Sequence, residues 1–344
     1  MPTDSPAADA VARTTAAPLL AVGFDIGGTN LRAAVVDERG RVLTRVQRSS
    51  DGSEAAIEAG IGSISKELVA EYPQVCAIGV AVAGFLDSQR RTVRFAPHLP
   101  WRDADLVKRL GSTLPRPLQL EHDANSAAWG EYRFGAARGA DNWVLFALGT
   151  GIGGAMMHGG QLYRGAFGTA PEFGHLTVVP EGRPCSCGKR GCLERYCSGT
   201  ALVTTVAELA ATSAFADSSL LAPLHQGTLT GTAVMAAAQA GDNLAVNALA
   251  QFSAWLGQGL SIVGDVFDPE LIVIGGGVSE AAESFLEAAT SEFAARITGA
   301  GHRPVAQIRI AQLGPDAGMI GVADIARQHA LRQATNVPFF GEST

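Results

Sequence analysis

Long apolar runs, an excess of basic residues and an even set of cysteines are all missing from this chain of 344 residues. Because no run approaches the roughly 20 apolar residues of a membrane-spanning helix, the sequence argues against a membrane protein. The 26 basic and 33 acidic residues give a net charge of −7, which disfavours nucleic acid as the main partner, since phosphate binding needs a basic face. Five cysteines, three of them clustered, indicate a metal site in a reducing compartment and not a disulfide framework. We therefore expect a cytoplasmic protein.

Length and hydrophobic content predict two lobes with buried cores. The chain is longer than a typical single domain, and its 47% of hydrophobic residues argues against general disorder. Residues 1–18 are rich in Ala, Thr, Ser, Pro and Asp and have no basic segment before a long apolar core. They are predicted to form a disordered tail and not a secretion signal.

A pattern of apolar strand, glycine turn and returning strand occurs twice, at 19–37 and at 143–158. Each copy lies at the start of one half of the chain, and this arrangement predicts a duplicated βββαβα unit. Further strands are expected at 41–47, 75–83, 118–122 and 271–274, and helices at 53–72, 123–134, 201–211, 232–240, 244–266, 317–330 and from about 279.

The first glycine turn, Asp25-Ile26-Gly27-Gly28-Thr29-Asn30, has the composition of a phosphate cradle. Glycines let backbone N–H groups approach phosphate oxygens, the Thr29 hydroxyl adds a donor, and Asp25 can orient a hydrated Mg²⁺ ion. It is not a Walker loop, because no Gly-Lys-Ser/Thr follows and the next expected element is a strand. An ordinary hairpin turn is the alternative.

The second glycine turn formally matches the G-x-G-x-x-G pattern of dinucleotide sites at Gly149, Gly151 and Gly154. That pattern requires a helix to begin at the last glycine, whereas residues 155–158 predict a strand. A second phosphate loop, paired with the first, is therefore favoured. A third glycine turn lies at 275–277.

Asp123 follows the strand expected at 118–122 and lies where a helix begins. Ligands of open α/β sheets bind at the carboxyl ends of the strands. A carboxylate in that place can act as a general base that takes a proton from a sugar hydroxyl during attack on a phosphoryl group. A helix N-cap is the alternative, and the local sequence alone favours it.

Three cysteines within 185–192 follow His175. Three thiolates and one imidazole suit tetrahedral zinc, and four protein ligands leave no position for water, so a structural site is predicted. Reduced cysteines packed in a loop are the alternative, disfavoured because Gly, Lys and Arg flank them. Glu172 and Glu194 bracket the set, and with the imidazole they suit a ligand rich in hydroxyl groups.

Taken together, these segments resemble the ROK family of sugar kinases and regulators, most closely its actinobacterial glucokinases. The likeness extends from about residue 22 to residue 327, and the cysteine motif is its most specific part. The motifs that carry it are Asp25-Ile26-Gly27-Gly28-Thr29, Phe95-Ala96-Pro97-His98-Leu99-Pro100-Trp101, Glu121-His122-Asp123-Ala124-Asn125, Leu148-Gly149-Thr150-Gly151, Glu172-Phe173-Gly174-His175 and Cys185-x-Cys187-Gly188-x-x-Gly191-Cys192-x-Glu194.

The resemblance implies an actin-like, hexokinase-type fold of the ribonuclease H-like class, with two α/β lobes and the active site in the cleft between them. The N-terminal lobe is expected at 19–135, joined by a C-terminal helix at 317–334. The C-terminal lobe, which carries the zinc loop, is expected at 136–316. The resemblance also implies a homo-oligomer, either a dimer or a pair of dimers.

The activity that the resemblance implies is an ATP-dependent glucokinase, which makes glucose 6-phosphate with Asp123 as catalytic base and Mg²⁺ on the nucleotide. Structural zinc is expected on His175, Cys185, Cys187 and Cys192. Sugar contacts are expected from Gly84, Phe85, His98, His122, Asp123, Asn125, Glu172, His175 and Glu194. Nucleotide contacts are expected from Asp25, Gly27, Gly28, Thr29, Asn30, Gly149, Thr150, Gly151, Gly275, Gly276 and Gly277.

Two histidines depart from the family pattern. Many relatives have Asn where this chain has His98 and His122, and the Asn beside the base commonly contacts a sugar hydroxyl. Histidine can still form a hydrogen bond, but its charge varies near neutral pH. Polyphosphate as donor, and another hexose or an N-acylhexosamine as acceptor, therefore stay open.

A sugar-responsive repressor, or a sugar-binding regulator without turnover, is the alternative from another class. Repressors of the family carry a helix-turn-helix domain before the first strand. Only about 20 residues precede that strand here, without apolar periodicity, so a kinase is favoured.

Overall fold

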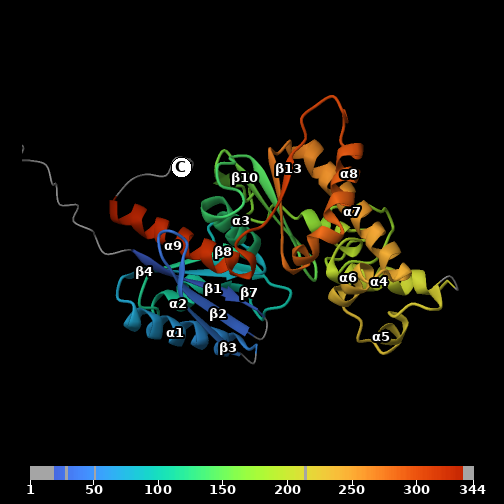
Figure 1. The fold of residues 1–344 in the computed structure, drawn as a ribbon. Coiled ribbons are helices and arrows are strands. Elements are labelled where there is room, and N and C mark those ends of the chain that lie inside the picture. Colours follow the sequence, from blue (N-terminus) through green and yellow to red (C-terminus); the bar gives the residue numbers. More distant parts are fainter. Residues whose placement is uncertain (1–18, 28–29, 50–51, 213–214, 336–344) are drawn as a thin grey trace, which may run out of the picture.

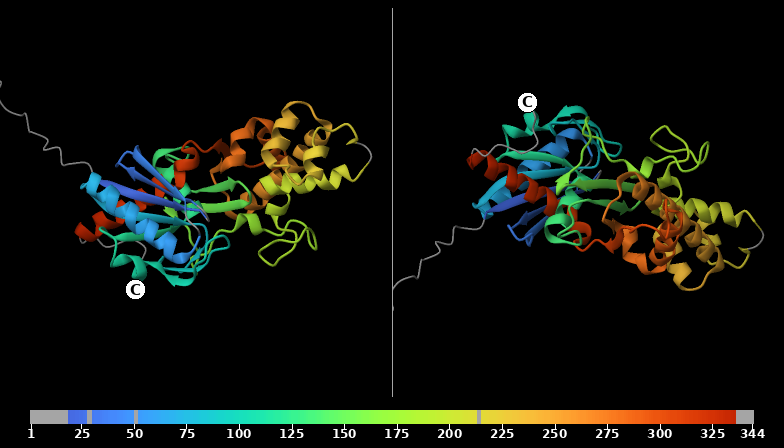
Figure 2. Two further views of the ribbon diagram at one scale, coloured as in Figure 1. Left: turned by 90° about the horizontal axis from the view of Figure 1, so that it is seen from below. Right: turned by 90° about the horizontal axis from the view of Figure 1, so that it is seen from above.

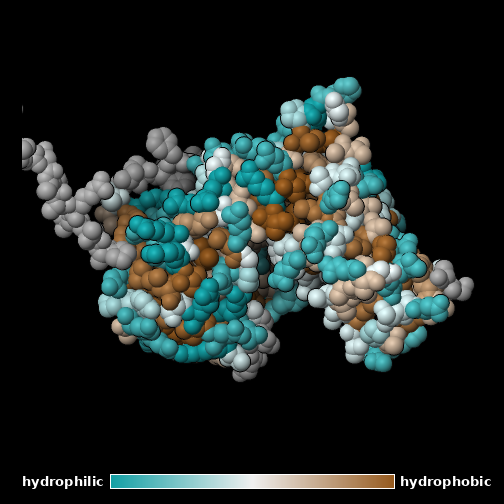
Figure 3. Space-filling model, viewed as in Figure 1, coloured by the Kyte–Doolittle hydropathy of each residue, from teal (hydrophilic) through white to brown (hydrophobic). Residues whose placement is uncertain are grey.

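The computed structural model describes residues 19–27, 30–49, 52–212 and 215–335. These residues form two five-stranded sheets and one three-stranded sheet, arranged in two lobes (Figures 1 and 2). The molecular surface is hollowed between the lobes (Figure 3). None of the described helices is long and apolar enough to cross a membrane. The tail expected at 1–18, and Gly28 and Thr29 of the first glycine turn, lie outside the described residues.

The first sheet has the strand order β3-β2-β1-β4-β8. Its strands are β1 (Leu20–Ile26), β2 (Asn30–Val36), β3 (Val42–Ser49), β4 (Val75–Val82) and β8 (Leu118–His122). Strand β4 pairs in parallel with both β1 and β8, so the carboxyl ends of three strands meet at one edge of the sheet. Helix α1 (Glu54–Glu71) buries Ile57, Ile61 and Ile64 in the core beneath this sheet.

The second sheet repeats this arrangement with the order β11-β10-β9-β12-β13. Its strands are β9 (Trp143–Leu148), β10 (Ile152–His158), β11 (Gln161–Leu162), β12 (Leu271–Gly275) and β13 (Gln307–Ile310). In both sheets the first strand pairs antiparallel with the second and parallel with the fourth. The predicted duplication is therefore confirmed.

Helices cover the second sheet over a large apolar core. They are α4 (Gly199–Ala210), α5 (Leu221–His225), α6 (Gly231–Gln239), α7 (Asn243–Phe267) and α8 (Leu286–Arg296). The helix expected from about residue 279 is not an α-helix. The chain forms the 3₁₀ helix η4 (Gly277–Ser284) there, because Gly276 turns with φ of 80° and Ala281 has non-helical dihedral angles.

A small third sheet in the first lobe was not predicted. It contains β5 (Phe85–Leu86), β6 (Thr92–Phe95) and β7 (Arg102–Asp105), and α2 (Leu106–Gly111) follows it. Strands of two to four residues are too short to show a hydrophobic period, so the sequence carries no signal for them.

The last helices of the two units pack together at the middle of the molecule. Helix α3 (Asp123–Phe134) follows β8 but also reaches β9 and β10, whereas α9 (Ala317–Thr335) lies on β1 and β4 of the first sheet (Figure 1). Glycine allows this close approach, because a Cβ on Gly321 would lie 1.7 Å from the carbonyl oxygen of Ser126. The division of the chain into lobes at residues 135 and 316 stays a prediction.

Gly23 offers a test of how α9 is held on the sheet. A Cβ at this position in β1 would lie 2.0 Å from the carbonyl oxygen of Met319, so Gly23→Ala is expected to lower the free energy of unfolding by about 1–3 kcal/mol. The control is Gly62→Ala in α1, where no atom lies within 4 Å and alanine is expected to stabilise by up to about 1 kcal/mol. Denaturant titration measures both values, and equal stability of the two variants would contradict the packing argument.

Candidate active site

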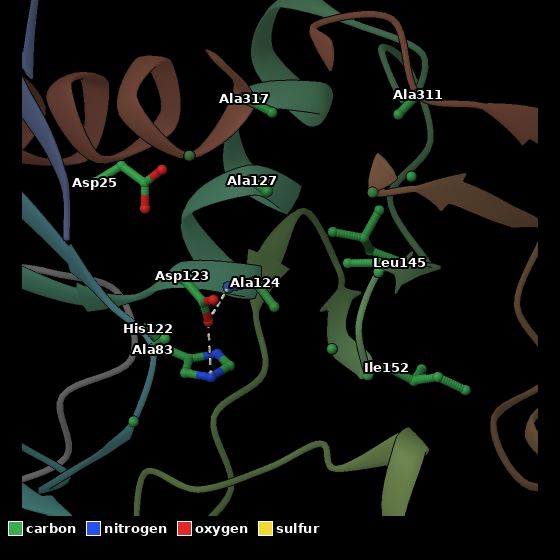
Figure 4. A pocket seen from close by; sticks show the side chains of 18 of the residues that line it. Asp25, Ala83, His122, Asp123, Ala124, Ala127, Leu145, Ile152, Ala311 and Ala317 are labelled. Carbon is green, nitrogen blue, oxygen red and sulfur yellow. Dashed lines mark hydrogen bonds and ion pairs between the residues drawn. The ribbon is translucent and has the colours of Figure 1, made fainter. Parts of the chain in front are cut away.

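A cleft with a volume of about 450 Å³ is lined by residues of both sheets and of the helices between them (Figure 4). It lies at the carboxyl ends of β4 and β8 in the first sheet and of β9 and β12 in the second. This is the edge at which open α/β sheets bind ligands.

Most of the predicted site residues lie in this cleft. Those that line it are Asp25, Gly84, Phe85, His98, His122, Asp123, Gly149, Gly151, Glu172, His175, Glu194, Gly275 and Gly276. Asn125 lines a small adjoining hollow instead. Gly27, Asn30, Thr150 and Gly277 are not among the lining residues of either. The individual roles of all these residues stay predictions.

Asp123 is the first residue of α3, and its carboxylate faces the cleft (Figure 4). The N-cap position belongs to His122, so the alternative that made Asp123 a capping residue is wrong. Its Oδ1 atom accepts a hydrogen bond from the N–H of Ala124 at 2.8 Å and lies 3.1 Å from Nε2 of His122. In the part of the chain that the structure describes, Oδ2 accepts no hydrogen bond and remains accessible to a ligand.

Asp25 is a second carboxylate in the cleft, near the carboxyl end of β1. Burial raises its pKa, the guanidinium of Arg32 at 3.2 Å opposes that rise, and the charge of Asp123 adds to it. Arg32 also donates to Asp316 at 3.3 Å, so it is shared between two carboxylates. A carboxylate such as that of Asp25, beside the glycine turns of the cleft, suits a hydrated divalent cation.

Glu172 and Glu194 approach the cleft from the second lobe. Burial raises the pKa of Glu172, while the imidazoles of His122 and His175 oppose the rise. Glu194 Oε2 accepts the N–H of Ile152 at 3.0 Å, which ties this carboxylate to the second glycine turn. A Cβ on Gly151 would lie 2.1 Å from the same oxygen, so the glycine is required by Glu194 as well as by any phosphate.

Four residues next to the cleft have their ligand atoms within 4.8 Å of one another, as a metal ion requires: His175, Cys185, Cys187 and Cys192. Cys185 Sγ lies 3.7 Å from His175 Nδ1, and Cys187 Sγ lies 3.7 Å from Cys192 Sγ. All five cysteines of the chain are free. The predicted metal-binding set is thus assembled, and His175 belongs both to it and to the wall of the cleft.

The loop that carries these cysteines depends on glycine. Gly191 has φ of 71°, and a Cβ on it would lie 1.6 Å from the carbonyl oxygen of Val179. The N–H of Cys185 donates to the carbonyl of Lys189 at 3.0 Å, which closes a tight turn around Cys187. The thiols are therefore directed to one point by the backbone.

A buried ion pair behind the cleft was not predicted. Glu121 is buried and lies 2.6 Å from the guanidinium of Arg164, which joins β8 to the segment after β11. Burial raises the pKa of Glu121, but Arg164, Arg90 and Asn125 together outweigh this effect and hold the pKa below its usual range. The same carboxylate accepts a hydrogen bond from Nδ2 of Asn125 at 3.1 Å, so Oδ1 of that amide points away from Glu121. Because 43 residues separate the ion pair, no local sequence signal marks it.

Glu131 of α3 also lines the cleft without having been predicted. Its buried carboxylate accepts the backbone N–H groups of Ala136, Gln312 and Leu313 at 2.7 to 3.1 Å. These bonds fix the segment between β13 and α9. Its residues Ala311, Gly314 and Pro315 line the cleft, together with Ala317 and Gly318 at the start of α9. The Gly-Pro pair before a helix was the signal that could have found this segment.

Comparison with known proteins gives a consistent result along the chain. The model of the ROK family matches residues 21–329. A glucokinase of Streptomyces coelicolor is 39% identical over 313 residues, which are 90% of this chain and 98% of that protein. A solved ROK family glucokinase from Streptomyces griseus in complex with glucose and AMPPNP is 41% identical with a TM-score of 0.79, over 90% of this chain and 99% of that one. A ROK hexokinase from Thermus thermophilus is 33% identical with a TM-score of 0.76, over 91% and 99%.

Proposed function

The chain belongs to the ROK family, and from this premise we propose that it is an ATP-dependent glucokinase, which transfers the γ-phosphoryl group of ATP to the 6-hydroxyl of D-glucose. The observation that carries the proposal is the carboxylate of Asp123, which lies at the end of β8 in a cleft that glycine turns of the second sheet also line. A base beside phosphate-binding turns is what transfer from a nucleotide to a hydroxyl needs.

The chemical step would use Asp123 as general base. The Oδ2 atom of Asp123 would take the proton of the 6-hydroxyl. At the same time the hydroxyl oxygen of the sugar would attack the γ-phosphorus, in line with the leaving ADP. Closure of the lobes would bring the two substrates together and exclude water from the transferring group.

The sugar would lie between Asp123 and the second-lobe residues Glu172, His175 and Glu194. Carboxylates accept hydrogen bonds from sugar hydroxyls, and an imidazole can donate or accept one. These groups belong to other elements than Asp123, which begins α3, so together they would fix which hydroxyl reaches the base.

The nucleotide would lie against the glycine turns and the N-terminus of α9. Gly149, Gly275 and Gly276 bring backbone close to the cleft without side chains, and Ala317 and Gly318 add a helix N-terminus that favours negative charge. Mg²⁺ on the phosphates would be oriented through Asp25.

We infer that zinc fits the four-residue metal site. Tetrahedral zinc with Zn–S bonds of about 2.3 Å separates two sulfurs by about 3.8 Å, and Cys187 and Cys192 are 3.7 Å apart. Three thiolates and an imidazole also suit zinc chemically. The ion would stabilise the loop and, by engaging Nδ1 of His175, would leave Nε2 free for the sugar side, where Glu172 lies 3.9 Å away.

A coupled kinase assay over a panel of sugars, with ATP and polyphosphate as donors, tests the function directly. We expect glucose with ATP to give the highest kcat/KM. Faster turnover with polyphosphate, another hexose or an N-acylhexosamine would reassign the donor or the acceptor. Absence of ADP release with every sugar would reject the kinase and favour a sugar-binding regulator.

Asp25→Asn is expected to lower kcat about 100-fold, because the hydrated Mg²⁺ loses an anchor.

The same variant also changes the stability of the protein. Burial raises the pKa of Asp25, so the charged form destabilises the folded protein. This destabilisation is present above the raised pKa and is lost as the pH falls through it. The variant should therefore melt at a higher temperature than the wild type at about pH 8, with the difference shrinking toward about pH 4. Asp103→Asn, at an exposed residue of β7, is the control. A variant that keeps full kcat would reject the proposed magnesium role.

We further propose a homo-oligomer, a dimer or a pair of dimers, that works in the cytoplasm with glucose and ATP as its partners. The five free cysteines agree with a reducing compartment. Light scattering of the purified chain checks the oligomeric state, and a monomer at micromolar concentration would contradict this proposal.

A further inference from the structure

The imidazole of His122 lies against the carboxylate of the proposed base. His122 ends β8 and Asp123 begins α3, yet the two side chains turn toward each other across the strand–helix junction (Figure 4). Nε2 of His122 lies 3.1 Å from Oδ1 of Asp123, a distance at which an N–H donates a good hydrogen bond. The contact lies inside the cleft, because both residues line it.

This contact gives the two carboxylate oxygens of Asp123 different roles. Oδ1 of Asp123 already accepts from the N–H of Ala124 at 2.8 Å, so the imidazole supplies its second donor. Among the described residues nothing donates to Oδ2, which is left to receive the proton of a substrate hydroxyl. Two donors on one oxygen also fix the rotation of the carboxylate, which catalysis by a positioned base requires.

Carboxylates face His122 from each of the elements around it. Asp123 lies on α3, Glu121 of β8 accepts the backbone N–H of His122 at 3.1 Å, and Glu172 approaches from the second lobe. Across the cleft, Asp25 of β1 interacts with Asp123. The other titratable lining residues are Glu131, Glu194, His98 and His175. Arginines offset two of these acids, because Arg164 pairs with Glu121 and Arg32 pairs with Asp25. In the described part of the chain, His122 is the side chain that lies within hydrogen-bond distance of Asp123.

We propose that His122 is a positioning residue for the base, which holds the carboxylate of Asp123 in the rotation that presents Oδ2 to the substrate hydroxyl. The inference rests on the proposed kinase function. The imidazole donates Nε2–H to Oδ1 and orients the carboxylate. In the step itself, the O–H bond of the 6-hydroxyl breaks, its proton passes to Oδ2, and its oxygen forms the new bond to phosphorus.

Steady-state kinetics of the full-length enzyme test this proposal. We expect His122→Ala to lower kcat about tenfold or more, and by a larger factor than it changes KM for glucose. His122→Asn keeps an N–H donor and is expected to keep kcat within about threefold of the wild type. The control is His158→Asn at the exposed end of β10, which should keep the wild-type kcat and KM. His122→Gln replaces His122→Asn if that variant fails to fold.

A second measurement tests the contact without turnover. In the ¹⁵N spectrum of the intact chain, the Nε2 signal of His122 is expected to shift when Asp123→Ala removes its partner, and the signals of His158 are expected not to. An unchanged signal, or a kcat of His122→Ala that equals the wild-type value, would overturn the proposal. A wild-type protein that phosphorylates no sugar would reject the kinase function, whereas the spectrum would still decide the contact.

Discussion

Asp123→Asn is expected to lower kcat for glucose phosphorylation about 1,000-fold while the protein keeps its fold and its melting temperature. The substitution preserves the size of the side chain and an oxygen that can accept from Ala124, but an amide takes no proton from the 6-hydroxyl. General-base catalysis typically contributes about 10²- to 10⁴-fold to the rate, and the expected loss of kcat lies within this range. Steady-state kinetics and thermal melting measure the two effects on one preparation.

The control for this variant is Asp103→Asn. Asp103 is an exposed aspartate with φ of 45°, a backbone conformation that asparagine tolerates well, and its partner is a surface arginine. Its kcat is expected to equal that of the wild type. Glucose binding, measured by calorimetry, should survive in Asp123→Asn within about tenfold, because the remaining groups of the cleft still engage the other hydroxyls. Near-normal turnover of the Asp123 variant would reject it as the base.

The parts of the site that the sequence predicted have local signals. An apolar strand followed by glycine marks the turns at Gly27 and Gly149. A strand followed by an acidic residue marks Asp123, whose role as the base stays a prediction. The spacing of the cysteines alone indicates a metal-binding site, because short loops with Gly188 and Gly191 can direct neighbouring thiols to one point. Elements with a long hydrophobic period, such as α1 and α7, are likewise found where the sequence expects them.

The parts that the sequence did not predict depend on contacts between distant segments. Glu121 meets Arg164 across 43 positions, and Glu131 meets the N–H of Gln312 across 181. Neither carboxylate differs in its local sequence from a surface residue, so only the folded chain identifies them as buried anchors. The start of α9 enters the cleft for the same reason, since its position depends on how α3 and α9 pack at Gly321.

Gly151 lines the cleft, and the structure gives a second reason for glycine at this position. The sequence placed it in a phosphate loop because glycine exposes backbone N–H groups. In the structure, any Cβ there would also collide with Glu194, which accepts the N–H of Ile152. The hydrogen bond from the N–H of Ile152 to Glu194 thus connects the second glycine turn to the loop of the metal site.

If the metal site holds zinc as proposed, Cys187→Ser is expected to remove most of it, lower the melting temperature and raise KM for glucose about tenfold or more. A serine hydroxyl is a poor zinc ligand at neutral pH, and the binding free energy of a structural metal contributes directly to folding. Without the ion, Nδ1 of His175 loses its anchor, and the ring no longer presents Nε2 beside Glu172. Loss of one hydrogen bond to a charged group costs about 1.5–3 kcal/mol, which corresponds to about 10- to 100-fold in sugar affinity.

Elemental analysis, thermal melting and kinetics measure these three effects, with Cys76→Ser as the matched control. Cys76 lies in β4, is half-buried and is not part of the metal-binding set, so its variant is expected to keep full zinc content and an unchanged KM. Complete loss of zinc from Cys187→Ser with unchanged glucose affinity would show that the loop is only a distant structural element.

The KM for ATP separates two routes by which the metal can act. If the ion works only through His175, its loss should affect glucose and leave ATP unchanged. Glu194, however, follows the ligand Cys192 by two residues and holds the N–H of Ile152 in the second glycine turn. Movement of the cysteine loop would therefore disturb the phosphate side as well. We expect KM for ATP to rise in Cys187→Ser by a smaller factor than KM for glucose, because the nucleotide keeps its contacts with the other glycine turns, and an unchanged KM for ATP would confine the effect to His175.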